Sequence, residues 1–328
     1  MRKAIIKKVR GLRFFLEYAG VMIFYCSIRI LPLNAIRTIS NISGRFLYLL
    51  PGFRKLCCAN IRTAFPEKPD CEIRRIAMES LQNMVQTILE LFWFSGRQDV
   101  LANLTEDSHI CVNLTKKSMK EGGLIWISPH IGNWELAAFN VSYGTKIPFA
   151  VVVRPQNNPM INDLIVRSRS SGGNRVIFAK GAVKGIIKAL KEGFFLATLI
   201  DQNTRIRDGG VFVNFFGLPS PASRAPAFFG KKMSVNIAVG GCLREKTGYR
   251  MFSEELPKKI PEYSSEEEII QDIMKITESI VRKHPEQYLW FYKRWQYIPI
   301  DASKEIEKKF PYYSRRATPR FYDNNAKK

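Results

Sequence analysis

Short apolar runs alternate with longer segments of helical hydrophobic spacing over the middle of the chain. The apolar runs have the length of buried strands and lie at 124–128, 147–153, 175–178, 194–200, 211–216 and 235–243. The helix-like segments lie between them, near 134–143, 158–170, 182–191 and 222–232. This alternation is typical of βαβ units. It predicts an α/β fold in which helices flank a central, mostly parallel sheet.

The pattern outside this region divides the chain of 328 residues into three parts. Residues 1–65 are predicted to be a basic, membrane-associated helical region, which the proline-bearing stretch FPEKPD closes. Residues 66–310 are predicted to form one α/β domain, with further helices at 72–94 and 264–284 where apolar residues recur at helical spacing. Residues 311–328 have the composition of a weakly ordered, basic tail.

The charge of the chain is concentrated near its N-terminus. Residues 1–65 contain twelve Lys and Arg residues and a single acidic residue, Glu17, and so carry half of the net charge of +22. These basic residues alternate with apolar ones, which is typical of a segment lying on an anionic membrane surface. Solvated arms that bind nucleic acid rarely contain such apolar stretches. We therefore expect an anionic membrane, and not a nucleic acid, as the partner of this region.

The apolar stretch within the N-terminal region is short for a membrane span. Glu17 and Arg29 enclose eleven uncharged residues, whereas a helix that crosses a bilayer needs about 20 apolar residues. The stretch 14–34 reaches that length only with both charges included. No small-residue cleavage site of a signal peptide follows it. An interfacial or tilted helix is therefore the favoured interpretation.

The cysteines and histidines do not form a metal-binding pattern. The chain has six cysteines and three histidines, and no two cysteines have the spacing of zinc ligands. We interpret the cysteines as reduced thiols on the cytoplasmic side of a membrane, and we expect no metal.

One of the three histidines, His130, lies in the stretch SPHIGNWELA, where a buried-strand pattern stops and a helical pattern begins. Gly132 permits a tight turn there, and Asn133 is suited to cap the helix that follows. A loop that turns into a helix can fold His130 back over the first helical turn, where Glu135 could accept a hydrogen bond from the imidazole. The other ring nitrogen would then face the carboxyl edge of the sheet, where α/β proteins bind ligands.

Such a pair suits the removal of a proton from a substrate hydroxyl. The imidazole supplies a base near neutral pH, and a carboxylate fixes its tautomer and stabilises the imidazolium. The alternative is a structural histidine that bonds to the backbone. Spacing alone does not separate the two.

The stretch around His130 resembles the histidine–four residues–acid signature of the glycerolipid acyltransferase superfamily. It resembles more closely the form found in the lipid A biosynthesis late acyltransferases, the lauroyl and myristoyl transferases. Further segments resemble other blocks of that family, in order along nearly the whole chain: RFFLEYAGV, ANIRTAFPEK, VVVRPQNNPMINDLI, IDQNTRIRDGGVFVNFFG and HPEQYLWFYKRW. A single His–Glu pair is a weak signal, whereas several ordered blocks are a strong one.

The resemblance implies a reaction and roles for two residues. His130 would deprotonate a hydroxyl of a lipid A precursor, and Glu135 would orient the imidazole. The alkoxide would attack an acyl thioester, on acyl carrier protein or on coenzyme A, without a cofactor. The enzyme would lie at the cytoplasmic face of a bacterial inner membrane, bound through its N-terminal helix. Backbone N–H groups at Gly132–Trp134 are candidates to stabilise the oxyanion.

Four further positions are candidates for substrate binding. Arg154 matches the arginine of the family's Arg-Pro block and suits an anion, although it could be a surface charge. Asp201 matches an acidic residue at the end of a core strand; it could position Arg154 or the acceptor, or simply form a turn. Asn133 could only cap its helix, and Gly132 could serve backbone geometry alone.

Three other functions share parts of this pattern. An acyltransferase could use another glycolipid, such as a phosphatidylinositol mannoside, with acyl-coenzyme A as donor. A nonenzymatic membrane-binding or nucleic-acid-binding protein would leave His130 purely structural. A thioester hydrolase would use the same base on water. The sequence sets neither the acyl chain length nor the oligomeric state.

Overall fold

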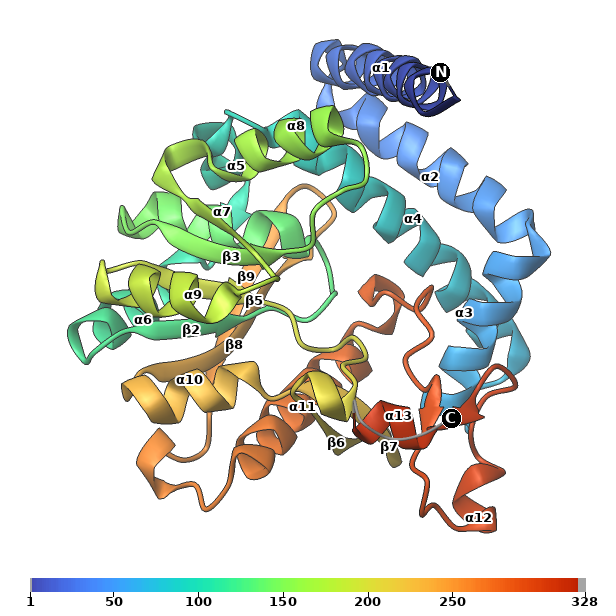
Figure 1. The fold of residues 1–328 in the computed structure, drawn as a ribbon, viewed down its shortest axis with the longest axis vertical. Coiled ribbons are helices and arrows are strands. Elements are labelled where there is room, and N and C mark those ends of the chain that lie inside the picture. The colour runs from blue at the N-terminus through green and yellow to red at the C-terminus, as the bar shows by residue number, and fades with distance from the viewer. Residues whose placement is uncertain (1, 324–328) are drawn as a thin grey trace.

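The central feature of the molecule is a seven-stranded sheet (Figure 1). The computed structural model describes residues 2–323 of the chain, with side chains from residue 11 onward. The strands follow the order β1 (Thr105–Glu106), β9 (Tyr249–Glu255), β8 (Asn236–Arg244), β2 (Leu124–Ile127), β5 (Phe195–Thr198), β3 (Phe149–Val153) and β4 (Arg175–Phe178). The pair β8–β9 is antiparallel, and the other neighbouring strands are parallel. The predicted α/β fold with a mostly parallel central sheet is therefore confirmed.

Helices cover both faces of this sheet because successive strand residues point to opposite sides. On β2, Ile125 and Ile127 join one core cluster and Leu124 and Trp126 join the other. The first cluster includes residues of α9 (Ala182–Lys191), α10 (Ala225–Met233) and α11 (Glu266–Lys283). The second includes residues of α6 (Ser108–Lys120) and α7 (Trp134–Thr145). Side chains from α4 (Asp70–Phe94) lie in both clusters, so this long helix contributes to the core on both faces of the sheet.

The segment predicted as a strand at 211–216 does not join the central sheet. It forms β6 (Gly210–Phe215), which pairs with β7 (Leu218–Ser223) in a separate antiparallel hairpin. Phe216 and Gly217 connect the two strands, and both have positive φ, at 52° and 76°. A two-residue turn of this kind sends the chain straight back on itself, so the two strands pair with each other.

The N-terminal region is helical, as predicted. It consists of α1 (Arg2–Ile30), α2 (Leu33–Leu49) and α3 (Pro51–Ala64). In Figure 1, α2 and α3 run along the outer side of α4, and α1 lies across the top of the view. The third helix buries Cys57 and Ile61 in the core of the α/β domain. The third helix is therefore packed into the core of the α/β domain that follows it.

Of the described helices, α1 is long and apolar enough to cross a membrane by length and composition, over Gly11–Ile30. Its large apolar side chains are mostly exposed, and so is a stripe on α2 that consists of Ile39, Ile42, Phe46 and Leu49. The opposite side of α2 packs on α4, where Gly44 lies against the backbone of Gln82.

The end of the chain differs from the expected weakly ordered tail over residues 311–323. This segment contains β11 (Arg315–Arg316), which pairs with β10 (Tyr297–Ile298), and α13 (Pro319–Tyr322). Phe321 is buried, with its ring 4.5 Å from that of Tyr297 and 5.7 Å from that of Phe212. Burial of this aromatic ring holds the segment on the domain. The last five residues of the predicted tail lie outside the described part of the chain.

Between α4 and α5 (Gln98–Asn103) the chain turns back toward β1, and α8 (Pro159–Arg169) follows β3. The N-cap residue of α8, Asn158, donates hydrogen bonds to the carbonyl of Phe14 and to Glu17 on α1. The apolar N-terminal helix therefore rests directly on a helix that borders the site described below.

Candidate active site

The loop at 128–133, which joins β2 to α7, presents His130 at the carboxyl edge of the sheet. Asn133 caps α7, because its side-chain oxygen accepts a hydrogen bond from the backbone N–H of Leu136 at 3.2 Å. Gly132 has φ +57°, and a Cβ atom there would lie 2.2 Å from the carbonyl oxygen of Cys242. Only glycine fits this close approach of two backbones.

The imidazole of His130 is hydrogen-bonded to Asp201. Its Nδ1 atom lies 2.6 Å from Oδ1 of Asp201, and the backbone N–H of His130 donates to Oδ2 at 2.9 Å. The carboxylate thus holds the ring and the backbone of one residue together. The opposite ring nitrogen, Nε2, lies 3.1 Å from the side-chain amide of Gln202.

Asp201 is buried, with 2% of its surface exposed, a short distance past the end of β5. Burial alone would raise the pKa of its carboxyl. The neighbouring His130, through its charge and its hydrogen bonds, and the charge of Arg294 together hold that pKa below its ordinary value of 3.8. Asp201 is therefore the ionised carboxylate that orients His130.

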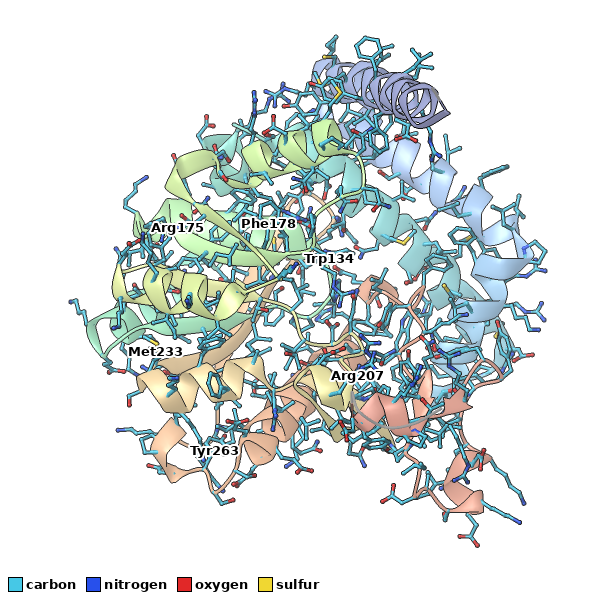
Figure 2. The ribbon with its side chains drawn as sticks, in the orientation of Figure 1. Trp134, Arg175, Phe178, Arg207, Met233 and Tyr263 are labelled. Atoms are coloured by element: carbon cyan, nitrogen blue, oxygen red, sulfur yellow. The ribbon has the colours of Figure 1, made fainter. Side chains whose placement is uncertain are left out.

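The prediction that Glu135 accepts a hydrogen bond from His130 is wrong for this structure. Glu135 instead forms a two-point ion pair with Arg169 of α8, at 2.6 and 3.3 Å. The reason is the direction of α7: its first turn carries Glu135 toward α8, whereas the imidazole is directed at the end of β5. The ring of Trp134, which is labelled in Figure 2, has its centroid 5.3 Å from that of the His130 ring.

His130 and Glu135 nevertheless line one cavity, of about 500 Å³. Its charged lining comes from these two residues together with Arg154 and Arg169. Ser128, Gln156, Thr198 and Gln202 are the other polar residues of the lining, and the apolar lining consists of the following side chains. These are Trp126, Trp134, Ala138, Phe139, Phe149, Val151, Val152, Val153, Ala197 and Leu199. The cavity therefore combines an imidazole, a carboxylate and two guanidinium groups with an apolar wall.

A second cavity, of about 680 Å³, adjoins the first. The two share Val152, Arg154 and Thr198 in their linings. Arg154 is exposed, at the end of β3, and so is available to a ligand in either cavity. In the described part of the chain no hydrogen bond or ion pair joins Asp201 to Arg154, and the Asp201 carboxylate contacts His130.

The expected oxyanion donors are largely engaged with the protein itself. The N–H of Gly132 donates to the carbonyl of Gln287 at 3.1 Å, and the N–H of Asn133 donates to the carbonyl of Cys242 at 2.7 Å. These two groups brace the loop and do not face a substrate.

Sequence reasoning missed Arg169, Gln202 and the Glu90–Arg244 ion pair that lies behind the loop. Gln202 adjoins Asp201 in the block IDQNT and could have been included with it. Arg169 has no local signal, because it is one of two arginines in the last turn of α8. Within the described residues, no group of three or more His, Cys, Asp or Glu side chains is placed to hold a metal ion.

Comparison with known proteins gives one consistent family. Residues 3–297 match the family described as bacterial lipid A biosynthesis acyltransferase. The chain is 25% identical to the lipid A biosynthesis lauroyltransferase of Escherichia coli (strain K12) over 88% of its own length and 93% of that protein. It is also 25% identical to the lipid A biosynthesis palmitoleoyltransferase of the same organism, over 74% and 79% of the two chains. A lipid A biosynthesis acyltransferase of Shigella flexneri matches to the same extent as the latter.

Proposed function

Since this chain belongs to the bacterial lipid A biosynthesis acyltransferase family and is an acyltransferase, we propose that it transfers a fatty acyl chain from an acyl thioester to a hydroxyl of a lipid A precursor. The observation that carries the proposal is the arrangement of His130. One ring nitrogen is fixed by a buried carboxylate, and the other borders the cavity. This is the arrangement of a general base.

The reaction requires two proton movements at this imidazole. Nε2 of His130 accepts the proton of the acceptor hydroxyl as the oxygen attacks the thioester carbonyl. The tetrahedral intermediate then collapses, the C–S bond breaks, and the thiolate receives the proton from the imidazolium. Asp201 keeps the proton of the neutral ring on Nδ1 and stabilises the imidazolium between the two movements.

Glu135 and Arg154 act in substrate binding in this proposal. Glu135 holds Arg169 at the cavity by a two-point ion pair, and Arg154 borders both cavities. The two guanidinium groups suit phosphate or carboxylate groups of an anionic glycolipid, since a guanidinium binds such groups through paired hydrogen bonds. Gly132 and Asn133 shape the loop and do not contact the substrate.

The donor is an acyl thioester of acyl carrier protein in this proposal. The net charge of +22 supports an acidic partner protein as well as an anionic lipid, because opposite charge accelerates encounter. Coenzyme A thioesters are the alternative donor. Initial rates with lauroyl and palmitoleoyl thioesters of each carrier would distinguish the two.

We place the enzyme on the cytoplasmic face of the inner membrane. The exposed apolar side chains of α1 and the stripe on α2 support membrane contact, and no acidic residue lies between Glu17 and Glu67. The six basic residues in that interval suit anionic headgroups.

The test combines lipid analysis with a matched histidine pair. Mass spectrometry of lipid A from cells with and without the protein should show a difference of one acyl group. Purified His130→Ala should fold normally and lose transfer, whereas His109→Ala, at an exposed position on α6, should retain it. Full transfer by folded His130→Ala would refute the mechanism. Release of free fatty acid in place of acylated lipid would identify a hydrolase.

A further inference from the structure

A buried ion pair lies directly behind the loop that carries His130. Arg244, the last residue of β8, donates from Nε and Nη2 to Oε2 of Glu90 on α4, at 3.2 and 2.8 Å. The Glu90 side chain has no exposed surface, and that of Arg244 is 11% exposed. Burial of two charges is costly, and apolar residues of similar size often give equal or greater stability at such positions. The pair therefore calls for an explanation other than stability.

The first part of the explanation is the carbonyl group of Gly132, which receives three donors. They are Nη1 of Arg244 at 2.8 Å, Nδ2 of Asn83 at 3.1 Å and the hydroxyl of Thr87 at 3.1 Å. Asn83 and Thr87 lie on α4, and each also accepts a hydrogen bond from the Arg244 guanidinium. The Arg244 guanidinium thus donates to this carbonyl and also to both of the other side chains that donate to it.

The second part is the side chain of Asn133. Its amide nitrogen donates to Oε2 of Glu90 at 2.7 Å, and its oxygen caps α7. The other oxygen of Glu90 accepts from Gln86 at 2.6 Å. Glu90 therefore fixes the cap residue, and Arg244 fixes the residue before it.

We propose that Glu90 and Arg244 are positioning residues for the general base: they hold Gly132 and Asn133 so that the imidazole two residues earlier stays directed at the cavity. The inference rests on the proposed function of His130. Neither side chain lines the cavity, so both act through the loop and not on substrate. A small displacement of a base from its productive geometry is costly, since a shift of about 1 Å can lower a rate by roughly 100-fold.

The test replaces the pair by apolar residues of similar volume, in the double variant Glu90→Leu/Arg244→Met. We expect a folded protein with unchanged circular dichroism and a melting temperature below that of the wild type, because Asn133 and Gln86 lose their buried acceptor. We expect kcat for transfer from a lauroyl thioester to a purified lipid A precursor to fall by roughly 100-fold, with KM changed by less than about twofold. A purely structural role would leave kcat intact in a protein that stays folded.

Two further variants keep the test decisive. Glu79→Gln removes an exposed ion pair with Arg75 on the same helix and should leave kcat unchanged. Thr87→Val removes one of the donors to Gly132 without changing charge or volume, and should lower kcat by roughly fivefold to tenfold at constant KM. If the double variant does not fold, Thr87→Val decides: unchanged kcat overturns the proposal.

His130→Ala, measured in parallel, separates this proposal from the proposed function. Full activity of His130→Ala would refute the function itself. Loss of activity in His130→Ala, together with wild-type kcat in the folded double variant, would overturn only the positioning role of Glu90 and Arg244.

Discussion

Nδ1 of His130 lies 2.6 Å from Oδ1 of Asp201, a residue 71 positions further along the chain. The same carboxylate accepts the backbone N–H of His130, so the orientation of the ring is tied to that of the loop. Nε2 is left beside Gln202 at the cavity. The orienting carboxylate of the proposed base is therefore Asp201. The acidic residue closest to His130 in sequence, Glu135, forms an ion pair with Arg169 instead.

Exchange of these two carboxylates for amides should have unequal effects. Asp201→Asn should lower kcat by roughly 10³- to 10⁴-fold, because an amide favours the wrong tautomer and does not stabilise the imidazolium. Glu135→Gln should lower kcat/KM by about tenfold, mainly through KM, because it weakens the hold on Arg169. Steady-state kinetics on both purified variants would measure the difference. An equal loss of kcat in Glu135→Gln would show that Glu135 reaches the imidazole during the reaction.

The Asp201 carboxyl should also affect stability at acid pH. Its pKa in the folded protein lies below the ordinary value of 3.8, so the unfolded chain binds its proton first as the pH falls. The contribution of the ionised carboxylate to the free energy of unfolding is therefore complete above about pH 4 and is lost as the pH falls through the folded-state pKa. The stability difference between wild type and Asp201→Asn should shrink below pH 4 in denaturant titrations. A difference that grows as the pH falls would contradict this assignment.

Gly132→Ala should be far more disruptive than a matched substitution elsewhere. The new Cβ would lie 2.2 Å from the carbonyl oxygen of Cys242, and φ is +57°. Gly193 also has positive φ, at +84°, but its Cβ would have no neighbour within 4 Å. Gly193→Ala should cost only the strain of the left-handed backbone, about 1 to 2 kcal/mol. Thermal unfolding of both variants would compare them, and similar melting temperatures would contradict the close packing at Gly132.

The apolar stripe on α2 should contribute to membrane binding. Ile42 and Phe46 are 62% and 61% exposed, so the double variant Ile42→Ser/Phe46→Ser should remain folded. Each substitution removes roughly 1 kcal/mol or more of apolar burial in a bilayer, which predicts binding weaker by about 10- to 100-fold. Flotation with mixed phosphatidylethanolamine–phosphatidylglycerol vesicles would measure it. Ile300→Ser, at an exposed position near the C-terminus, is the control and should bind as the wild type does.

The sequence by itself determined the local features of this protein. Alternating apolar runs and helical segments predict the α/β class, because strand and helix periodicity are properties of neighbouring residues. The loop with Gly132, the capping Asn133 and the candidate base His130 are visible for the same reason, since each depends on the residues beside it. The hairpin at β6 and β7 was not anticipated, because its strand pattern does not show which partner it will choose.

Only the tertiary structure decided which side chains meet. The partner of His130 depends on the order of strands in the sheet, which places β5 next to β2 and so brings Asp201 to the loop. Arg169 reaches Glu135 across 34 positions, and Arg244 reaches Glu90 across 154. Such contacts are fixed by the packing of whole helices and strands, and no periodicity along the chain records them. The sequence therefore indicated the candidate base, and the fold selected the carboxylate that contacts it.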